Sequence, residues 1–463
     1  MKPLSPFKAD LDKNLDSGFG ASDGNTLKSQ ALAKINAKSP RDWRALQWLT
    51  IGIGIKRWGL IAALGLLLFA TGMLLALAYV AVDLSVGMVE WIGGMTHQLV
   101  ETERIGWFMI GAGVMLFLVG MRGTLQAVEL ALAPGSGGFL EAAIRRRKLE
   151  HGEELVALGG GTGLSTMLRG LKHYTSNITA IVTMADDGGS SGRLRKDGML
   201  PPGDLRNCMA ALADAEPEMQ ELFQHRFTGM GELEGHSLGN LIVAAMCERT
   251  GSFESAVRET SKVLSLRGSV LPSTVESIEL GARLADGSEV MGQVKVHESE
   301  GIQEVFLKPD SPAALPGVLT AIAEAEVIII GPGSLYTSIL PNLLVPEIGE
   351  ALKAAKAPKI YVCNVMTQAG ETLGYKASDH VRAILRHIGK DAIDIALVNS
   401  AKIPEEVLER YRKTRADYVE ADLAAIEMLG VRPIQGNFAD VTDVVRHNPQ
   451  KLAQAIFRIV AKL

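Results

Sequence analysis

The chain has 463 residues, of which 47% are hydrophobic, and a formal net charge of −5. This length allows one large domain with additional segments, and the mildly acidic balance argues against a nucleic-acid partner. Cys208, Cys247 and Cys363 are far apart and match no CxxC spacing. They therefore indicate reduced thiols rather than a disulfide framework or a zinc site.

The N-terminal part of the chain contains two long apolar runs. Residues 1–40 are polar and without periodicity, which predicts a disordered cytoplasmic tail. Gly59–Val82 has 24 residues without a charge and Ile105–Met121 has 17, which as helices would be about 36 Å and about 25 Å long. Such runs are rare in soluble cores. We therefore expect a transmembrane hairpin over residues 41–123, and a buried hairpin of a soluble protein is the alternative.

Charges around these runs predict the topology. The loop between them is mainly acidic, whereas basic residues flank the pair: Arg41, Arg44, Lys56 and Arg57 before it, and Arg122, Arg145, Arg146, Arg147 and Lys148 after it. The positive-inside rule places both termini and the large C-terminal part in the cytoplasm, with the hairpin in the inner membrane. Residues 124–153 form a basic linker that contains a flexible break at Ala133–Gly138. The second run has small residues of the kind that pack helices together, and we expect a homo-oligomer: Gly106, Gly111, Ala112, Gly113 and Gly120.

Short apolar runs alternate with helical segments from Glu154 onward. We expect strands at 155–158, 179–184, 325–330, 359–363 and 393–398, and helices at 163–173, 203–213, 239–249, 252–265, 313–323, 346–355, 378–387 and 404–415. This alternation predicts an α/β fold with a parallel sheet covered on both faces. The pair Asp286-Gly287 predicts a hairpin turn, so Thr274–Leu307 should form a small antiparallel β insertion at the edge of the main sheet.

A glycine-rich loop follows the first predicted strand. Backbone N–H groups of glycines can approach an anion closely, and the helix that begins there adds partial positive charge. The loop is neither a GxGxxG motif nor a Walker loop, so a plain strand-to-helix turn is the alternative. The predicted phosphate-binding residues are Gly160, Gly161, Thr162 and Gly163.

A second glycine loop follows the second predicted strand. Adjacent Asp186 and Asp187 repel each other unless a cation, an arginine or ribose hydroxyls lie beside them. We expect one of them to take the ribose or Mg²⁺, with Asp187 as the metal ligand, and we expect no redox cofactor. Arg193 can bind a phosphate through two hydrogen bonds. The alternative for the whole loop is a solvated acidic turn without a ligand. The other expected ligand-binding residues of this loop are Gly188, Gly189, Ser190 and Ser191.

Further polar residues stand at the ends of predicted strands or the starts of helices. In an open parallel sheet, ligands bind at the carboxyl ends of the strands, so these residues complete the expected pocket. The first two glycine loops should hold a diphosphate together, and the later loops should line the sugar side. The additional residues are Asp204, Arg206, Asn207, Asn240, Gly331, Gly333, Ser334, Thr337 and Asn364.

No Ser-His-Asp arrangement, HExxH motif or activated cysteine is evident. We therefore predict no catalytic residue. Binding of a phosphorylated ligand, or group transfer by positioning and a metal ion, are the activities that remain.

Several of these segments resemble one protein family. VALGGGTGLSTMLRGLK, TMADDGGSSGRLR, LPPGDLRNC, HSLGNL, GPGSLYTSILPNLLV and VVRHNPQKLA occur in this order over roughly Glu154–Ile459. Together they are similar to the YvcK-like gluconeogenesis factors, which share a superfamily with the CofD 2-phospho-L-lactate transferases. The resemblance implies a Rossmann-like α/β fold and, for the YvcK branch, binding of UDP-sugars such as UDP-N-acetylglucosamine. It also implies that Tyr411 and Arg446 stack on or bind the UDP-sugar.

Three hypotheses follow for the function. The first is a membrane-tethered regulator that binds a UDP-sugar and controls cell shape, cell-wall supply or growth on gluconeogenic carbon, without catalysis. The second is a CofD-like transferase that builds a deazaflavin cofactor with Mg²⁺. The third is a membrane scaffold with a vestigial pocket, whose protein partners the sequence does not identify.

Overall fold

The structure is a computed structural model that describes residues 55–86, 96–132, 147–196, 198–214, 217–229, 231–442 and 444–462. The chain divides into two compact units, Met1–Ala143 and Ile144–Leu463, and each is described by itself. The predicted N-terminal tail and the predicted break at Ala133–Gly138 lie outside the described residues.

Two long antiparallel helices form the described part of the first unit. They are α3 (Ile55–Val86) and α4 (Thr96–Leu132), and both extend beyond the predicted spans. Each contains a stretch apolar and long enough to cross a membrane, Trp58–Leu75 and Ile105–Thr124, of which 11% and 17% is buried. Leu67, Leu74 and Phe108 are among many large side chains exposed on their surface.

Glycines bring α3 and α4 into backbone contact. A Cβ on Gly72 would lie 2.8 Å from the Ile110 nitrogen, and one on Gly113 would collide with the Phe69 backbone. Gly120 meets α3 in the same way, whereas a Cβ on Gly111 would have no atom within 4 Å. Gly113 and Gly120, which we expected to pack helices, therefore pack the two helices of one chain.

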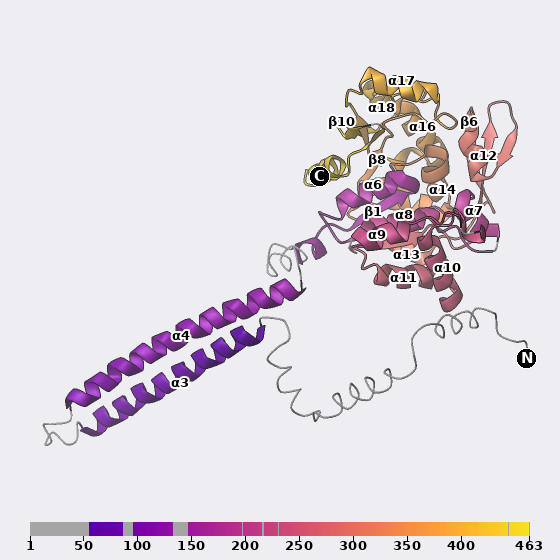
Figure 1. Cartoon of the computed structure of the whole chain (residues 1–463). Helices are drawn as coiled ribbons and strands as arrows, with labels where there is room; N and C mark the ends of the chain where they lie inside the picture. Colours follow the sequence, from indigo (N-terminus) through magenta and orange to yellow (C-terminus); the bar gives the residue numbers. More distant parts are fainter. Residues whose placement is uncertain are drawn as a thin grey trace, which may run out of the picture. The chain divides into compact units, whose positions relative to one another are not determined.

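A seven-stranded parallel sheet forms the centre of the second unit (Figure 1). Its order is β10-β9-β8-β7-β1-β2-β3, so the chain moves outward from β1 to β3 and then returns to the other side of β1 at β7. The switch point between β1 and β7 is where ligands bind in open α/β sheets. The strands are β1 (Leu155–Gly159), β2 (Ile178–Val182), β3 (Ser269–Pro272), β7 (Val327–Ile330), β8 (Lys359–Val362), β9 (Ile395–Asn399) and β10 (Arg432–Gly436).

The five strands predicted from apolar runs are confirmed, and they form the buried middle of the sheet. Every residue of β1, β7 and β9 is buried. The sequence did not predict β3 and β10, which are the two edge strands. Edge strands are only partly covered, so SVLP and RPIQG lack a continuous apolar run, and each contains a proline of the kind that edges tolerate.

All eight predicted helices are present. They are α6 (Gly161–Leu171), α8 (Gly203–Leu212), α10 (Leu238–Thr250), α11 (Phe253–Val263), α13 (Pro316–Glu324), α15 (Pro346–Ala354), α16 (Ala377–Ile388) and α17 (Glu405–Lys413). Several helices were not predicted, and most of them are short or begin with glycine or proline. They are α7 (Gly189–Lys196), α9 (Pro217–Gln224), α12 (Gln293–Glu298), α14 (Leu340–Leu343), α18 (Leu423–Met428) and α19 (Pro449–Val460). By contrast, α19 has a clear amphipathic period that was not used for the prediction.

The predicted antiparallel insertion is confirmed as a separate sheet of order β5-β4-β6. Its strands are β4 (Glu279–Leu284), β5 (Glu289–Met291) and β6 (Ile302–Lys308), and Gly287 in the predicted turn has a φ of +85°. The insertion follows edge strand β3 in the chain, but it packs against α16, where the Val305 N–H donates to His387 Nε2 at 3.0 Å. Two further short strands, β11 (Ala439–Val441) and β12 (Val445–His447), form a ladder just before α19.

Candidate functional site

A cavity of about 290 Å³ lies at the carboxyl ends of β1, β7 and β8. We call it cavity A. It is lined by the loops that follow these three strands, and by Tyr411 of α17 and the β12 strand. Its lining residues are Gly160, Gly161, Thr162, Gly163, Thr166, Pro332, Gly333, Ser334, Ser338, Asn364, Val365, Met366, Thr367, Gln368, Tyr411, Val445, Arg446 and His447.

The first glycine loop has its shape because no side chain fits there. Gly161 has a φ of +65°, which disfavours residues with a Cβ. A Cβ on Gly163 would stand 2.6 Å from the carbonyl oxygen of Pro332. The loop after β1 and the loop after β7 therefore touch backbone to backbone, which places their N–H groups and hydroxyls around one space.

The third loop is partly helical, which the sequence did not predict. After Gly331, with a φ of +81°, the chain forms a single π-helical turn over Leu335–Ile339 that runs into α14. Ser334 and Ser338 line cavity A, whereas Gly331 and Thr337 do not. The Thr337 hydroxyl instead donates to Glu371 at 2.5 Å. π-Helical turns are frequent at functional sites.

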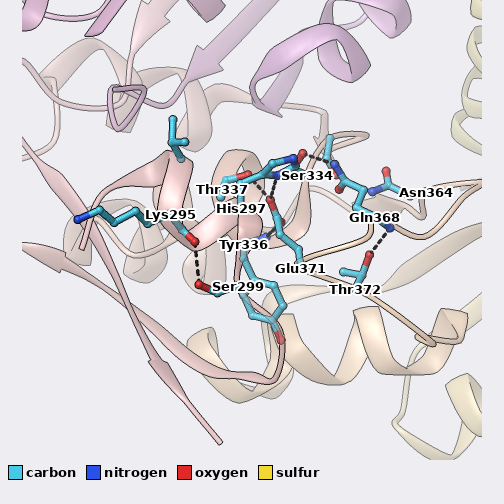
Figure 2. A network of polar contacts seen from close by, with 12 residues as sticks. Lys295, His297, Ser299, Ser334, Tyr336, Thr337, Asn364, Gln368, Glu371 and Thr372 are labelled. Carbon is cyan, nitrogen blue, oxygen red and sulfur yellow. Dashed lines mark hydrogen bonds and ion pairs between the residues drawn. The ribbon is translucent and has the colours of Figure 1, made fainter. Parts of the chain in front are cut away.

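Polar side chains after β8 fix this loop from the other side (Figure 2). The Asn364 amide donates to the Gly333 carbonyl at 2.8 Å, and the Gln368 amide donates to the Ser334 hydroxyl at 2.9 Å. Asn364 is thus at the predicted place, but its amide is already engaged in holding the loop.

Tyr411, Arg446 and His447 close the cavity opposite the glycine loop. The Tyr411 hydroxyl accepts the Val445 N–H at 2.8 Å and so fixes β12. Arg446 lines the cavity, and its side chain forms no hydrogen bond or ion pair with any residue that the structure describes. Both ring nitrogens of His447 are buried, and burial lowers the pKa of this imidazole to about 4, although the nearby backbone of Cys363 opposes the shift. A neutral histidine and a free guanidinium thus face the same space.

A second cavity, of about 260 Å³, lies beside the first, and we call it cavity B. The second glycine loop, the start of α8 and one residue of α10 line it. Its residues are Asp186, Gly188, Gly189, Ser190, Ser191, Gly203, Asp204, Arg206, Asn207, Arg226 and Asn240. The first two glycine loops, which we expected to hold one diphosphate together, therefore line two different cavities. The first loop adjoins cavity B at the start of α8, where a Cβ on Gly160 would stand 2.6 Å from Asp204 Oδ2.

Two carboxyl groups face each other in cavity B. Removal from water, and then the neighbouring Asp186, raise the pKa of Asp204 to about 7, although the Gly161 N–H donates to it. Desolvation also raises the pKa of Asp186, while the Gly188 N–H at 3.0 Å and the Ser191 hydroxyl oppose that rise. A cation between the two carboxyl groups would relieve both effects.

Hydroxyl and amide groups complete cavity B. The Ser190 hydroxyl lies 3.0 Å from both His236 Nδ1 and the Asn240 amide nitrogen. Asn240 Oδ1 and Arg206 Nε are buried without a partner in the described part of the chain. Carboxylate and amide oxygens are ligands that Mg²⁺ accepts, and Asp186, Asp204 and the free Asn240 oxygen fit such an ion. No group of three histidine, cysteine or acidic side chains suited to a metal occurs among the described residues.

Asp187 and Arg193 lie outside both cavities. The Asp187 carboxyl accepts the N–H groups of Gln293 at 2.9 Å and Val294 at 3.0 Å, at the start of α12. Arg193 donates to the Glu234 carbonyl at 2.7 Å. The predicted metal ligand and the predicted phosphate-binding arginine thus both have protein partners in this structure, and their ligand roles stay predictions.

Sequence reasoning missed several lining residues. Thr166 and His447 lie in the quoted segments VALGGGTGLSTMLRGLK and VVRHNPQKLA but were not named as site residues, whereas Gln368 lies in none of the quoted segments; the fold brings all three to cavity A. Arg226 reaches cavity B from a short segment after α9. Ser338 was not missed: the sequence offers it, with Ser334 and Thr337, as a hydroxyl donor of the third loop, and it lines cavity A.

Comparison with known proteins gives a family. A model of the family described as 2-phospho-L-lactate transferase CofD matches residues 155–439. The gluconeogenesis factor of Bacillus subtilis is 52% identical over 306 residues, which are 65% of this chain and 96% of that protein. A protein of Nostoc sp., provisionally given the same name, is 44% identical over 440 residues, 94% of this chain and 96% of its own.

A solved structure agrees with these matches. The crystal structure of a protein of the UPF0052 family from Bacillus halodurans is 50% identical, covers 66% of this chain and 99% of its own, and superposes with a TM-score of 0.64. The Bacillus proteins thus correspond to the second unit, whereas the Nostoc protein matches most of the N-terminal part as well. The chain belongs to the gluconeogenesis factor family of CofD-like proteins.

Proposed function

We propose that cavity A binds a UDP-sugar and that the protein acts through this ligand as a regulator of carbon supply to the cell wall and of cell shape. The observation that carries the proposal is the composition of the cavity. The N-terminus of α6, the Ser334 and Ser338 side chains and the Arg446 guanidinium line one space. Helix N-termini, hydroxyls and arginine are the groups that bind phosphate in proteins.

The remaining lining suits the rest of such a ligand. Tyr411 presents an aromatic ring at the same cavity, and Val365 and Met366 give it an apolar side. The neutral His447 can donate one hydrogen bond and accept another, which fits a uracil edge or a sugar hydroxyl. Mg²⁺ between Asp186, Asp204 and Asn240 would lie next to the Gly160 loop and neutralise charge on a diphosphate.

Ligand-dependent stability of the full chain in detergent tests the proposal. UDP-N-acetylglucosamine at a hundredfold excess over its Kd should raise the free energy of unfolding by about 2.7 kcal/mol. UDP-glucose and UDP are the related ligands, and GDP and inorganic phosphate are the controls. Equal shifts with phosphate and with UDP-N-acetylglucosamine, or no shift with any UDP-sugar, would contradict the proposal.

A transferase function is the second candidate, because the CofD model matches and cavity B, which adjoins cavity A, is lined by two carboxyl groups with raised pKa values. In that case the acceptor would occupy cavity B. Incubation with a deazaflavin acceptor, guanylylated phospholactate and Mg²⁺ decides between the two: a phospholactyl product supports the transferase, and its absence together with UDP-sugar binding supports the regulator.

We also propose that the hairpin tethers this domain to the inner membrane, with both termini in the cytoplasm. The exposed leucines of α3 and α4 and the basic flanks support this arrangement. A reporter fused after Leu463 should be active only in the cytoplasm, and activity confined to the periplasm would contradict it.

A further inference from the structure

We infer that Glu371 is a positioning residue for ligand binding: it holds the Ser334–Ser338 segment in its binding geometry and ties that segment to the β insertion through His297. The inference rests on the proposed nucleotide-sugar site in cavity A. Glu371 itself does not line either cavity, so it acts through the residues that it contacts.

Glu371 holds the π-helical turn by accepting hydrogen bonds from it (Figure 2). Its side chain is 0% exposed. One carboxyl oxygen accepts the Tyr336 N–H at 2.9 Å, and the other accepts the Thr337 hydroxyl at 2.5 Å. The first N–H groups of a helical turn lack partners within the turn, and Glu371 supplies one. The Ser334 and Ser338 hydroxyls on either side of these contacts are thereby fixed toward cavity A.

A third contact joins this support to the β insertion. His297 Nδ1 lies 2.7 Å from the same Glu371 oxygen that Thr337 reaches, although the two residues are 74 positions apart. The hydrogen bond to Glu371 raises the pKa of His297. Next to it, Gly370 has no room for a Cβ because the His297 carbonyl lies there. The β insertion and the cavity loop therefore both form hydrogen bonds with the Glu371 carboxyl group.

The helix that carries His297 is held at its other end as well. Asp187, which follows Asp186 of cavity B, accepts the N–H groups of Gln293 and Val294 at the start of α12. Asp187 thus holds the start of α12, next to Asp186 of cavity B. Glu371 holds the helix near its end, through His297, and also contacts the loop of cavity A. Removal of the Glu371 anchor should release the Ser334–Ser338 segment while the sheet and its core remain intact.

Four forms of the full chain in detergent test the inference. Glu371→Gln keeps the shape, but a single amide oxygen cannot accept from Thr337 and His297 as well as Tyr336. His297→Gln removes only the link to the insertion. Glu279→Gln removes an exposed carboxyl of the same insertion, and Val318→Ala lowers core stability in α13 without touching either cavity. For each form we would measure the Kd for UDP-N-acetylglucosamine and the hydrogen exchange of peptides covering residues 334–340.

Glu371→Gln should weaken binding by about tenfold, the effect expected when one charge-assisted hydrogen bond is lost. It should also speed exchange over 334–340, and His297→Gln should change both in the same direction by less. Glu279→Gln and Val318→Ala should match the wild type at a temperature where all forms are folded. Binding of Glu371→Gln within twofold of the wild type, or weakening by Val318→Ala to the same degree, would overturn the inference.

If the wild type binds no UDP-sugar, the proposed function fails, and the exchange measurement still decides this inference. Faster exchange over 334–340 in Glu371→Gln, with a smaller increase in His297→Gln and none in Glu279→Gln or Val318→Ala, would support the positioning role. Unchanged exchange would overturn it.

Discussion

Gly160 and Asp204 meet at the wall between the two cavities. A Cβ on Gly160 would stand 2.6 Å from Asp204 Oδ2, so the absent side chain leaves the room that the carboxyl group occupies. The glycine loop of cavity A and the acidic site of cavity B are therefore one side chain apart. A diphosphate in the first and a cation in the second would interact directly.

The raised pKa of Asp204 predicts a specific pH dependence of stability. Its folded pKa of about 7 lies above its ordinary value of 3.8, so the folded protein binds the proton more tightly than the unfolded chain does. The contribution of this group to stability is complete below pH 3.8 and is lost as the pH rises through about 7. The total loss is at most about 4 kcal/mol, less where cavity water screens the charge.

Asp204→Asn should remove this dependence. The free energy of unfolding of both proteins would be measured in urea at pH 4.5, 5.5, 6.5 and 7.5, about the range between the two pKa values. The difference between the two proteins at each pH isolates Asp204, because most other titrating groups contribute equally to both. The variant should gain stability relative to the wild type as the pH rises. A difference that stays constant with pH would show that Asp204 ionises normally.

Asp187→Asn should loosen the β insertion rather than remove a metal. The carboxyl group accepts two N–H groups at the start of α12, and loss of a comparable helix cap costs about 1 kcal/mol. Hydrogen exchange over residues 289–298 should accelerate, while Mg²⁺ binding should persist.

Asp186→Asn is the matched comparison, because it changes the adjacent carboxyl group, which lines cavity B. It should weaken Mg²⁺ binding and leave exchange over 289–298 unchanged. The reverse pattern, with Mg²⁺ lost only in Asp187→Asn, would restore Asp187 as the metal ligand.

Arg446→Ala should weaken UDP-sugar binding by a factor of about 10 to 100, the effect of losing a charge-assisted phosphate contact of about 1.5–3 kcal/mol. The stability of the ligand-free protein should change little, because the Arg446 side chain has no partner in the described part of the chain. Isothermal titration calorimetry measures the binding, and urea unfolding without ligand measures the stability. The control is Arg458→Ala on α19, which removes a guanidinium outside both cavities; equal losses in the two variants would indicate a general charge effect.

Gly113→Leu should separate the two helices of the hairpin. Its side chain would collide with the Phe69 backbone, which cannot move without displacing α3. Gly111→Leu is the control, because a Cβ there meets no atom within 4 Å. In membrane vesicles, protease should cleave the hairpin of the first variant faster than that of the second. Equal protection in both variants would contradict the observed packing, and a changed oligomeric state in Gly111→Leu would place a second copy on that face.

Local pattern was sufficient for most of the fold. Apolar runs such as Val327–Ile330 predict buried strands because a parallel sheet covered on both faces excludes water from both sides of each strand. The Asp286-Gly287 turn was predictable because a positive φ there favours glycine. Edge strand β10 was missed because none of its residues is fully buried, so no continuous apolar run marks it.

The role of each side chain at the site depended on tertiary structure. The sequence by itself determined which loops end the strands and which residues can contact phosphate, because glycine, hydroxyl and arginine have fixed local capacities. Only the tertiary structure decided that Asp187 holds α12, 106 and 107 residues away, that Glu371 supports the cavity loop and that His447 faces cavity A. These roles depend on which distant backbone groups meet each side chain, and that is set by how helices and strands pack, which no local pattern encodes.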